Sequence, residues 1–329
     1  MANVIQSILG FIKSIFKFHK LKILLVFTSA LLFTVLLFPY SDLADFTTAQ
    51  VSKMTNNQVF LSFDEMGIGL LPTPSVDLEK VQVETAQVSN LKVGSLSIAP
   101  SIAALLSFKK GVALSAEDLL KGDLNLVYKE GDLVKGKKEI RSQNIEADFV
   151  KVDLAEIEKL YPLPVKLKGQ ASGDIEVSID PSFSTQPDGT TEMKIKNFVM
   201  PPGSVNTQMG PIDTPEIKFS EVKLRGKISG SSFNIEEVLL GKTNDAINGK
   251  VRGKMTIKIK RFGAKVAPVF GAYNFDISLN ITKAKASELF FLSFLDSFKQ
   301  NTNKGSRFLF AVSGTRFGVT PNMKSTQPF

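Results

Sequence analysis

The sequence predicts a mainly β protein, in which an N-terminal transmembrane helix precedes an elongated, curved and largely antiparallel β-sheet with a few short helices. Two observations lead to this fold class. Residues 23–41 carry no charge, and much of the chain after them alternates strictly between apolar and polar residues. No boundary divides the part after the uncharged run, so we expect one β-rich domain over residues 42–329.

The uncharged run has the length of about 20 residues that a helix needs to cross a bilayer. Four lysines lie between residues 13 and 22, no acidic residue precedes the run, and Asp42 follows it. The positive-inside rule then predicts a cytoplasmic tail over 1–20, a transmembrane anchor over 21–41 and a periplasmic domain, with the anchor in the bacterial inner membrane. The alternative is a cleaved signal peptide, whose cleavage site Asp42 and Ala44 fit poorly.

The tail before the anchor carries apolar residues at helical spacing with lysines between them. These residues are Ile5, Ile8, Leu9, Ile12, Ile15 and Phe16. The pattern predicts a basic amphipathic helix on the inner leaflet, or a simple extension of the membrane helix. His19 is the single histidine of the chain, and we expect it at the membrane interface rather than in a metal site.

The clearest alternation runs over residues 163–179, where odd positions are apolar or small and the even positions from Lys166 onward are polar. This pattern predicts a strand with one apolar face. Gly169 and Gly173 interrupt that face, which indicates a bend or a close approach of another backbone. The pattern recurs over residues 124–126, 145–149, 251–259, 273–281 and 308–312.

Turns and helices are fewer than strands. Asn248-Gly249 and Asp188-Gly189 predict turns, and one-sided strands joined by turns indicate an antiparallel sheet. Short helical patterns cover residues 100–107, 153–160 and 287–298. Residues 200–215 contain four prolines and two glycines, so we expect an irregular loop there.

A long sheet with one apolar face forms a closed barrel, a sandwich or an open curved groove. The sequence leaves the sandwich and the groove open. In a groove, apolar residues of the same parity within each strand would line one concave surface. These candidates are Val165, Leu167, Ile175, Val177, Ile257, Ile259, Phe275, Ile277 and Leu279.

Two segments resemble the AsmA-like periplasmic proteins. Residues 95–131, SLSIAPSIAALLSFKKGVALSAEDLLKGDLNLVYKEG, resemble a unit in which a strand leads to a P-x-x-x-x-L-L helix, a short loop, and a strand with a G-x-L hairpin. Residues 152–177 resemble the next unit, a short helix before a Leu-Pro and a Gly-x-x-x-Gly strand. A single anchor followed by about 290 residues of this pattern is similar to the N component of type II secretion systems.

This resemblance implies a non-enzymatic inner-membrane component of a type II protein secretion system, which works with other inner-membrane or periplasmic components. The alternative is an AsmA-like protein of the cell envelope that binds or transfers membrane lipids. The family has no catalytic residues to carry over, and it implies no cofactor. Cargo and oligomeric state do not follow from the sequence.

The residues themselves also predict no enzyme, metal or cofactor. The chain has no cysteine, no P-loop and no Gly-x-Ser-x-Gly motif. Asp64-Glu65 and Glu236-Glu237 are adjacent acidic pairs, which point to opposite faces in a strand. A membrane-anchored enzyme with an unrecognised site stays a third hypothesis.

A basic segment, residues 223–265, holds eleven lysines and arginines against three acidic residues. It has only two aromatic residues, so we expect no nucleic-acid binding. One interpretation is a lysine-rich outer face that prevents edge pairing. The other is contact with anionic headgroups through Lys250, Arg252, Lys254, Lys258 and Lys260.

Overall fold

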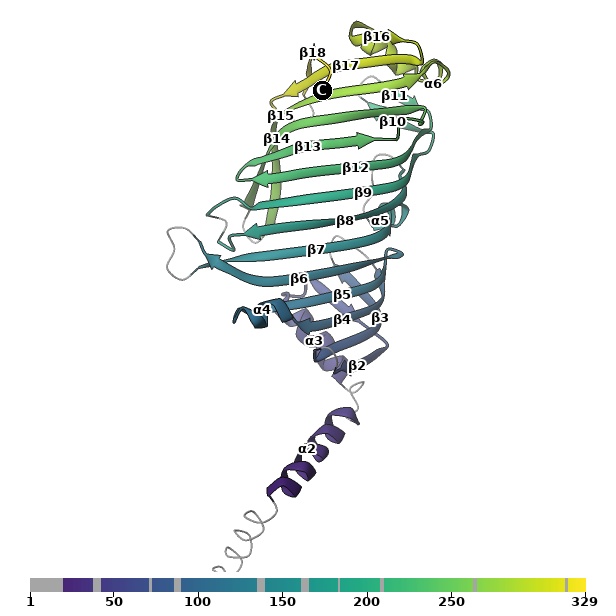
Figure 1. Ribbon diagram of the computed structural model, residues 1–329. Coiled ribbons are helices and arrows are strands. Elements are labelled where there is room, and N and C mark those ends of the chain that lie inside the picture. Colours follow the sequence, from purple (N-terminus) through teal and green to yellow (C-terminus); the bar gives the residue numbers. More distant parts are fainter. Residues whose placement is uncertain are drawn as a thin grey trace, which may run out of the picture.

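The computed structural model of the chain describes residues 20–37, 43–70, 73–85, 90–134, 140–160, 166–182, 184–207, 210–262, 265–316 and 319–329. The expected amphipathic tail with His19, the end of the expected anchor and the candidate groove residue Val165 lie outside these ranges. The fold is mainly β, as predicted, with one large antiparallel sheet and a few short helices (Figure 1).

Within the described ranges the large sheet has 16 strands, and their neighbours are antiparallel. The strands are β1 (Val59–Ser62), β2 (Glu65–Gly69), β3 (Ser75–Thr85), β4 (Leu91–Pro100), β5 (Gly111–Leu119), β6 (Gly122–Leu133), β7 (Arg141–Asp153), β8 (Lys168–Ile179), β9 (Asp188–Met200), β12 (Ile217–Ser229), β13 (Ser232–Leu240), β14 (Ile247–Phe262), β15 (Lys265–Thr282), β16 (Lys299–Thr302), β17 (Gly305–Gly314) and β18 (Asn322–Ser325).

The strands follow one another as a meander, so most of them pair with the next strand in the chain. The path runs β1-β3-β4-β5-β6-β7-β8-β9-β12-β13-β14-β15-β17-β16, with β2 on β3 and β18 on β17. Short connections of this kind suit antiparallel neighbours. The described ranges contain no second large sheet facing the first, so they form no sandwich.

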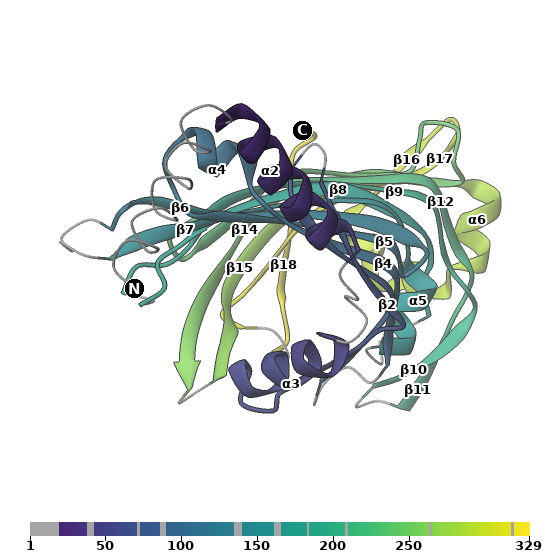
Figure 2. The same ribbon diagram turned by 90° about the horizontal axis from the view of Figure 1, so that it is seen from below.

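Register shifts curve the sheet. They occur in seven strand pairs of the described sheet, for example between Arg225 and Gly226 of β12 and between Met255 and Ile257 of β14. An extra residue in one strand bends that strand and increases its twist. Figure 2 shows the result along the stack of strands, where the sheet forms an arch.

A helix identifies the inner side of this arch. The helix α3 (Ala44–Met54) lies opposite the curved sheet in Figure 2, and its residue Val51 packs against the buried cluster that contains Leu78 and Val81 of β3. The side of the sheet that carries Leu78 is therefore the concave side. We call it the inner face, and the opposite side the outer face.

Buried side chains gather at the two ends of the inner face. One cluster contains Leu61, Leu78, Val81, Val93 and Ala116 of the first strands, beneath α3. The other contains Ile247, Ile281, Leu289, Leu292, Phe308 and Phe310 of the last strands. The hydrophobic core is thus divided between the ends of the sheet.

Two of the three predicted helices are confirmed. The helix α4 (Ile102–Leu106) lies within the predicted range 100–107, and α5 (Leu154–Leu160) matches 153–160, with Asp153 accepting a hydrogen bond from the Ala155 N–H at 2.9 Å. The third prediction was wrong in detail. The helix α6 (Lys283–Glu288) ends where it was expected to begin, and the 3-10 helix η2 (Phe290–Phe298) follows, because Leu289 leaves the helical region at φ −99° and ψ 74°.

The predicted anchor corresponds in part to α2 (Lys20–Leu36), a helix of 17 residues. Its large side chains, among them Leu24, Val26 and Phe27, are exposed. Judged on the described ranges alone, the molecule has no helix whose length and apolar character together suffice for crossing a membrane.

Both predicted turns were wrong, because Asp188-Gly189 begins β9 and Asn248-Gly249 lies in β14. The glycines serve the close approach of a neighbouring strand. A β-carbon on Gly249 would come within 2.7 Å of Leu279 Cδ2, and one on Gly189 would collide with the Glu176 carbonyl. The connection before β14 instead begins at Gly241, with φ +68°.

The predicted loop over 200–215 was also wrong in part, because it contains the hairpin of β10 (Gly203–Thr207) and β11 (Gly210–Thr214). Each of these strands has one neighbour in the described ranges. Proline is tolerated in such strands, because the side without a partner needs no N–H donor. Pro211 pairs with Asn206 in this hairpin.

Candidate functional site

The candidate site is the inner face of the sheet, along which one apolar row crosses twelve strands. Directly paired residues of antiparallel strands share a face, so the register alone defines the row. From β3 to β17 it consists of Leu78, Leu96, Ala116, Leu124, Phe149, Gly173, Met193, Leu224, Val238, Val251, Ile277 and Phe310. We call it the central row, and none of its members is polar.

A second row runs beside the central row, two residues along each strand except β13, where a register shift makes the step three residues. Its members are Val76, Ile98, Leu114, Leu126, Ala147, Ile175, Thr191, Gly226, Ile235, Gly253, Phe275 and Val312. Thr191 is its one polar side chain, and its hydroxyl donates to the Asp174 carbonyl at 3.2 Å. Eleven strand spacings of about 4.8 Å make these rows about 50 Å long.

The rows contain three of the predicted groove residues, Ile175, Phe275 and Ile277, and the register places two more beside them. Val177 pairs with Gly189, and Leu279 pairs with Gly249, on the same face. Leu167 is half-buried but lies before β8, which begins at Lys168. The predicted strand over 163–179 therefore begins too early, because Lys166 and Leu167 are not part of β8. The remaining predicted residues lie on a separate ribbon described below.

The burial of the central row changes along its length. Leu78 and Phe310, at its two ends, are buried within the two clusters under α3 and beside η2. Between them, the members from Phe149 to Val251 are only half-buried, and Ile175 of the second row keeps 36% of its surface exposed. In the described ranges the middle of the inner face is thus apolar and incompletely covered.

Rings cover the glycines of this face. A β-carbon built on Gly226 would lie 2.5 Å from Cζ of Phe233, and one on Gly173 would lie 3.1 Å from Cζ of Phe149. The ring of Tyr273 lies over Gly314 in the same way. Each of these rings occupies space that a side chain at the paired glycine would fill.

One flank of the inner face is formed by the far ends of β14 and β15 (Figure 2). Beyond Thr256 and Tyr273 these two strands outrun their neighbours β13 and β17 and pair with each other. The predicted groove residues Ile257 and Ile259 lie on this ribbon, which we define as residues 256–262 and 265–271. The register shift after Met255 separates it from the central row.

The segment before β9 contacts this ribbon. The side-chain amide of Gln186 accepts from the Ile259 N–H at 2.7 Å and donates to the Ile259 carbonyl at 3.3 Å. Just before it, the buried carboxylate of Asp180 accepts hydrogen bonds from Ser182, Ser184 and Thr185. The hydroxyl hydrogen bonds from Ser182 and Ser184 lower the pKa of Asp180 well below its usual value.

The sequence reasoning missed Asp180 and Gln186. The run Asp180-Pro181-Ser182 is a turn signal that indicates the Asp180 cap, because aspartate before proline commonly bonds the backbone after it. No comparable signal points to Gln186, whose partner lies 73 residues away.

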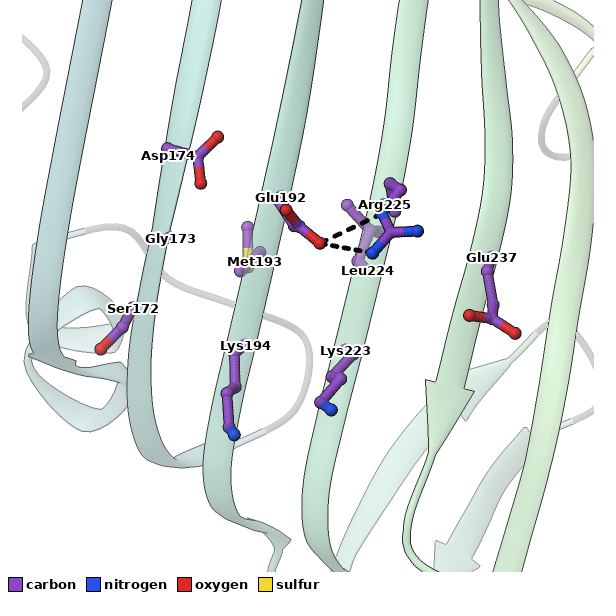
Figure 3. A pocket seen from close by; sticks show the side chains of 10 residues that line it. All are labelled: Ser172, Gly173, Asp174, Glu192, Met193, Lys194, Lys223, Leu224, Arg225 and Glu237. Carbon is purple, nitrogen blue, oxygen red and sulfur yellow. Dashed lines mark hydrogen bonds and ion pairs between the residues drawn. The ribbon is translucent and has the colours of Figure 1, made fainter.

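The outer face carries ion pairs across neighbouring strands. A depression of about 420 Å³ lies on it. Figure 3 shows its side chains, among which Arg225 donates to Glu192 at 2.7 Å. Glu221 pairs with Lys194 at 2.6 Å and Lys223 at 3.2 Å, and Lys194 in particular lowers the pKa of Glu221. In the described part of the chain, the charged groups of this depression are paired except for the carboxylate of Asp174, so most of its charge is neutralised on a solvated surface.

The predicted headgroup residues follow one another at the same parity along β14. Lys250 pairs with Glu237 at 3.4 Å, and Arg252 pairs with Asp276 at 3.4 Å while its guanidinium lies 4.0 Å from the ring centre of Phe329. Lys254 is followed by Lys258 and Lys260, which lie on the ribbon. Anionic lipid would have to displace existing partners at Lys250 and Arg252.

Across the described ranges, no group of three or more histidine, aspartate or glutamate side chains is placed to hold a metal ion. Comparison with known proteins gives no match, because neither a family model nor a curated protein matches the sequence, and no solved structure matches the fold.

Proposed function

We propose that this chain is a non-enzymatic protein of the bacterial envelope that holds the acyl chains of membrane lipids along its inner face. The observation that carries the proposal is the central row, which is apolar over twelve strands and incompletely covered in its middle. Contiguous exposed apolar surface in a soluble domain marks a site for an apolar partner. No reactive side chain is needed for this role.

The dimensions and energetics suit acyl chains. A 30 Å hydrocarbon core holds two acyl chains end to end, so rows of about 50 Å have room for about three such chains in line. Each methylene group that leaves water for an apolar surface gains about 0.8 kcal/mol. The rings that fill the space above glycines add apolar contact surface for extended chains.

The same proposal includes a membrane anchor. The exposed apolar side chains of α2, with lysines on its N-terminal side, support a location in the inner membrane with the tail in the cytoplasm and the β-rich body in the periplasm. A body attached to the membrane in this way has its inner face next to a source of lipid.

A second candidate is the inner-membrane component of a type II secretion system. The resemblance of residues 95–131 and 152–177 favours it, and α4 and α5 fall where the resembling units have their helices. The two functions are compatible, since a secretion component can carry lipid. Loss of secreted enzymes without a change in envelope lipid after gene deletion would favour secretion, and the reverse would favour lipid transport.

The proposal is tested by extracting the full-length protein with mild detergent and measuring bound phospholipid by mass spectrometry. We expect lipid with the wild type, and its loss in Ile175→Asp, which places a charge in the exposed middle of the inner face. The matched control is Ser178→Asp, on the outer face of the same strand, which keeps the lipid. Lipid-free wild-type protein, or equal lipid in both variants, contradicts the proposal.

A further inference from the structure

Helix α4 is built in an unusual way, with its small residues toward the sheet and its large residues toward solvent. Ala104 is 1% exposed and lies so close to Gly111 of β5 that a β-carbon there would collide with it. By contrast, Leu105 is 56% exposed, Leu106 is 78% exposed and Phe108 is fully exposed. A helix that only served packing would turn its leucines inward.

The end of α4 fixes Phe108 in this exposed position. The Phe108 N–H donates to the Leu105 carbonyl at 3.1 Å, and the Lys109 N–H donates to the Ala104 carbonyl at 2.9 Å. These are the two hydrogen bonds of a Schellman motif, whose left-handed residue is usually glycine. Here Phe108 takes that place with φ +53°, a conformation that a bulky residue rarely adopts.

A strained backbone that exposes a full aromatic side chain points to a use outside the fold. Ile102, Leu105, Leu106 and Phe108 form one exposed apolar protrusion, which we call the knuckle. Lys109 and Lys110 follow it directly, and Lys109 also pairs with Asp132 at 3.1 Å. Large apolar side chains beside lysines are typical of segments that enter the headgroup region of a bilayer.

The knuckle also lies at the end of the sheet that belongs near the anchor. It connects β4 to β5, which follow β1 and β3 at the edge of the sheet, and Figure 1 shows α4 at the same end of the molecule as α2. Beside it Val112 is 44% exposed, and it pairs with Tyr128 on the inner face. The helix α4 itself lies on the outer side of β5, because Ala104 contacts Gly111, which alternates with Val112 along the strand.

We propose that the knuckle inserts into the headgroup region of the membrane that holds α2. This inference rests on the proposed anchoring and lipid binding. Its partner is an anionic phospholipid surface, because the flanking residues are basic and the exposed side chains are apolar.

The chain has no cysteine, so one introduced cysteine gives a single labelling site. The full-length protein would carry an environment-sensitive fluorophore at Phe108→Cys, in vesicles of phosphatidylethanolamine and phosphatidylglycerol. We expect strong quenching by nitroxide-labelled lipid and protection from aqueous iodide. The control is Phe294→Cys in η2, 73% exposed at the other end of the sheet, which should show the opposite pattern.

A second variant separates membrane contact from folding. Glycine is favoured at the position of Phe108, so Phe108→Gly retains the fold, and its melting temperature should not fall. With the fluorophore at Leu106→Cys, this change should reduce nitroxide quenching severalfold. Unchanged quenching in this variant overturns the inference. A label at residue 108 that iodide reaches freely also overturns it. So does a label at residue 108 that is protected from iodide but not quenched by lipid, because that result indicates a protein partner.

These outcomes are independent of the lipid carried by the protein. If the label at residue 108 is exposed to water while the protein still co-purifies with phospholipid, membrane insertion of the knuckle is wrong and the proposed function stands. If the label at residue 108 is quenched by lipid while the purified protein carries no phospholipid, the knuckle contacts the membrane but the proposed binding of acyl chains is wrong.

Discussion

Gln186 and Ile259 are 73 residues apart in the chain, and the amide of the first pairs with both main-chain groups of the second, at 2.7 and 3.3 Å. Gln186 thereby replaces a neighbouring strand for one residue of the ribbon. The Asp180 cap keeps the loop in place from which Gln186 reaches Ile259. This link connects the flank of the inner face to the segment before β9.

We therefore predict that Gln186→Ala loosens the ribbon. Two hydrogen bonds of about 0.5–1.5 kcal/mol each are lost, so the free energy of local opening should fall by about 1–3 kcal/mol. Amide hydrogen exchange at Ile259 should accelerate by about 10- to 100-fold, while the central row keeps its protection. Gln186→Glu, which retains the acceptor and loses the donor, should give a smaller effect, and unchanged exchange in both variants would show that the link is dispensable.

Asp180 gives a prediction about pH. Its folded-state pKa lies below the usual 3.8, so its contribution to stability is complete above that value and is lost as pH falls toward the folded-state pKa. Asp180→Asn should be less stable than the wild type at neutral pH, and the difference should shrink below about pH 4. Urea unfolding at several pH values measures this difference, and a constant difference down to pH 2 would contradict the assignment.

Buried and exposed side chains of the region around η2 should differ in their contribution to stability. Phe308 is 1% exposed in the cluster beside η2, so Phe308→Ala should lower the free energy of unfolding by about 3–5 kcal/mol. Phe294 in the same region is 73% exposed, so Phe294→Ala should change it by less than about 0.5 kcal/mol. Equal losses, measured by thermal or urea unfolding, would place the core elsewhere.

The proposed topology predicts the activity of fused reporters. A reporter that works only outside the cytoplasm should be active after Phe329 and silent after His19. The mature protein should also retain its first residues, because the anchor is not cleaved. An N-terminus near Asp45 on the purified protein would instead identify residues 23–41 as a removed signal peptide.

Strand periodicity predicted much of the fold, because alternation reports directly which side chains share a face. Ile175, Val177, Phe275, Ile277 and Leu279 were assigned to one surface from parity alone, and the register places all five on the inner face. Ile257 and Ile259 keep the parity of Met255 on β14, because the extra residue of the register shift lies on β15. The sequence did not show that this end of β14 leaves β13 and pairs with β15 alone.

Glycines were the least predictable feature, since a glycine can form a turn or can lie in a strand where another backbone comes close. Gly249 and Gly189 looked like turn residues but lie in strands, where a β-carbon would strike the neighbouring backbone. The sequence also did not predict the hairpin that contains Pro211 or the exposed leucines of α4. Both features depend on which strand edges and helix faces have no neighbour in the fold. Such surfaces follow from the assembled sheet and not from local pattern.

The most direct test of the account is photocrosslinking in living cells, with a benzophenone amino acid in place of Leu224 or Lys227. Both positions lie on β12, Leu224 in the central row and Lys227 on the outer face. If acyl chains lie along the inner face, mass spectrometry should find phospholipid attached at position 224 and not at position 227. Absence of lipid at position 224, or equal attachment at both positions, would contradict the account.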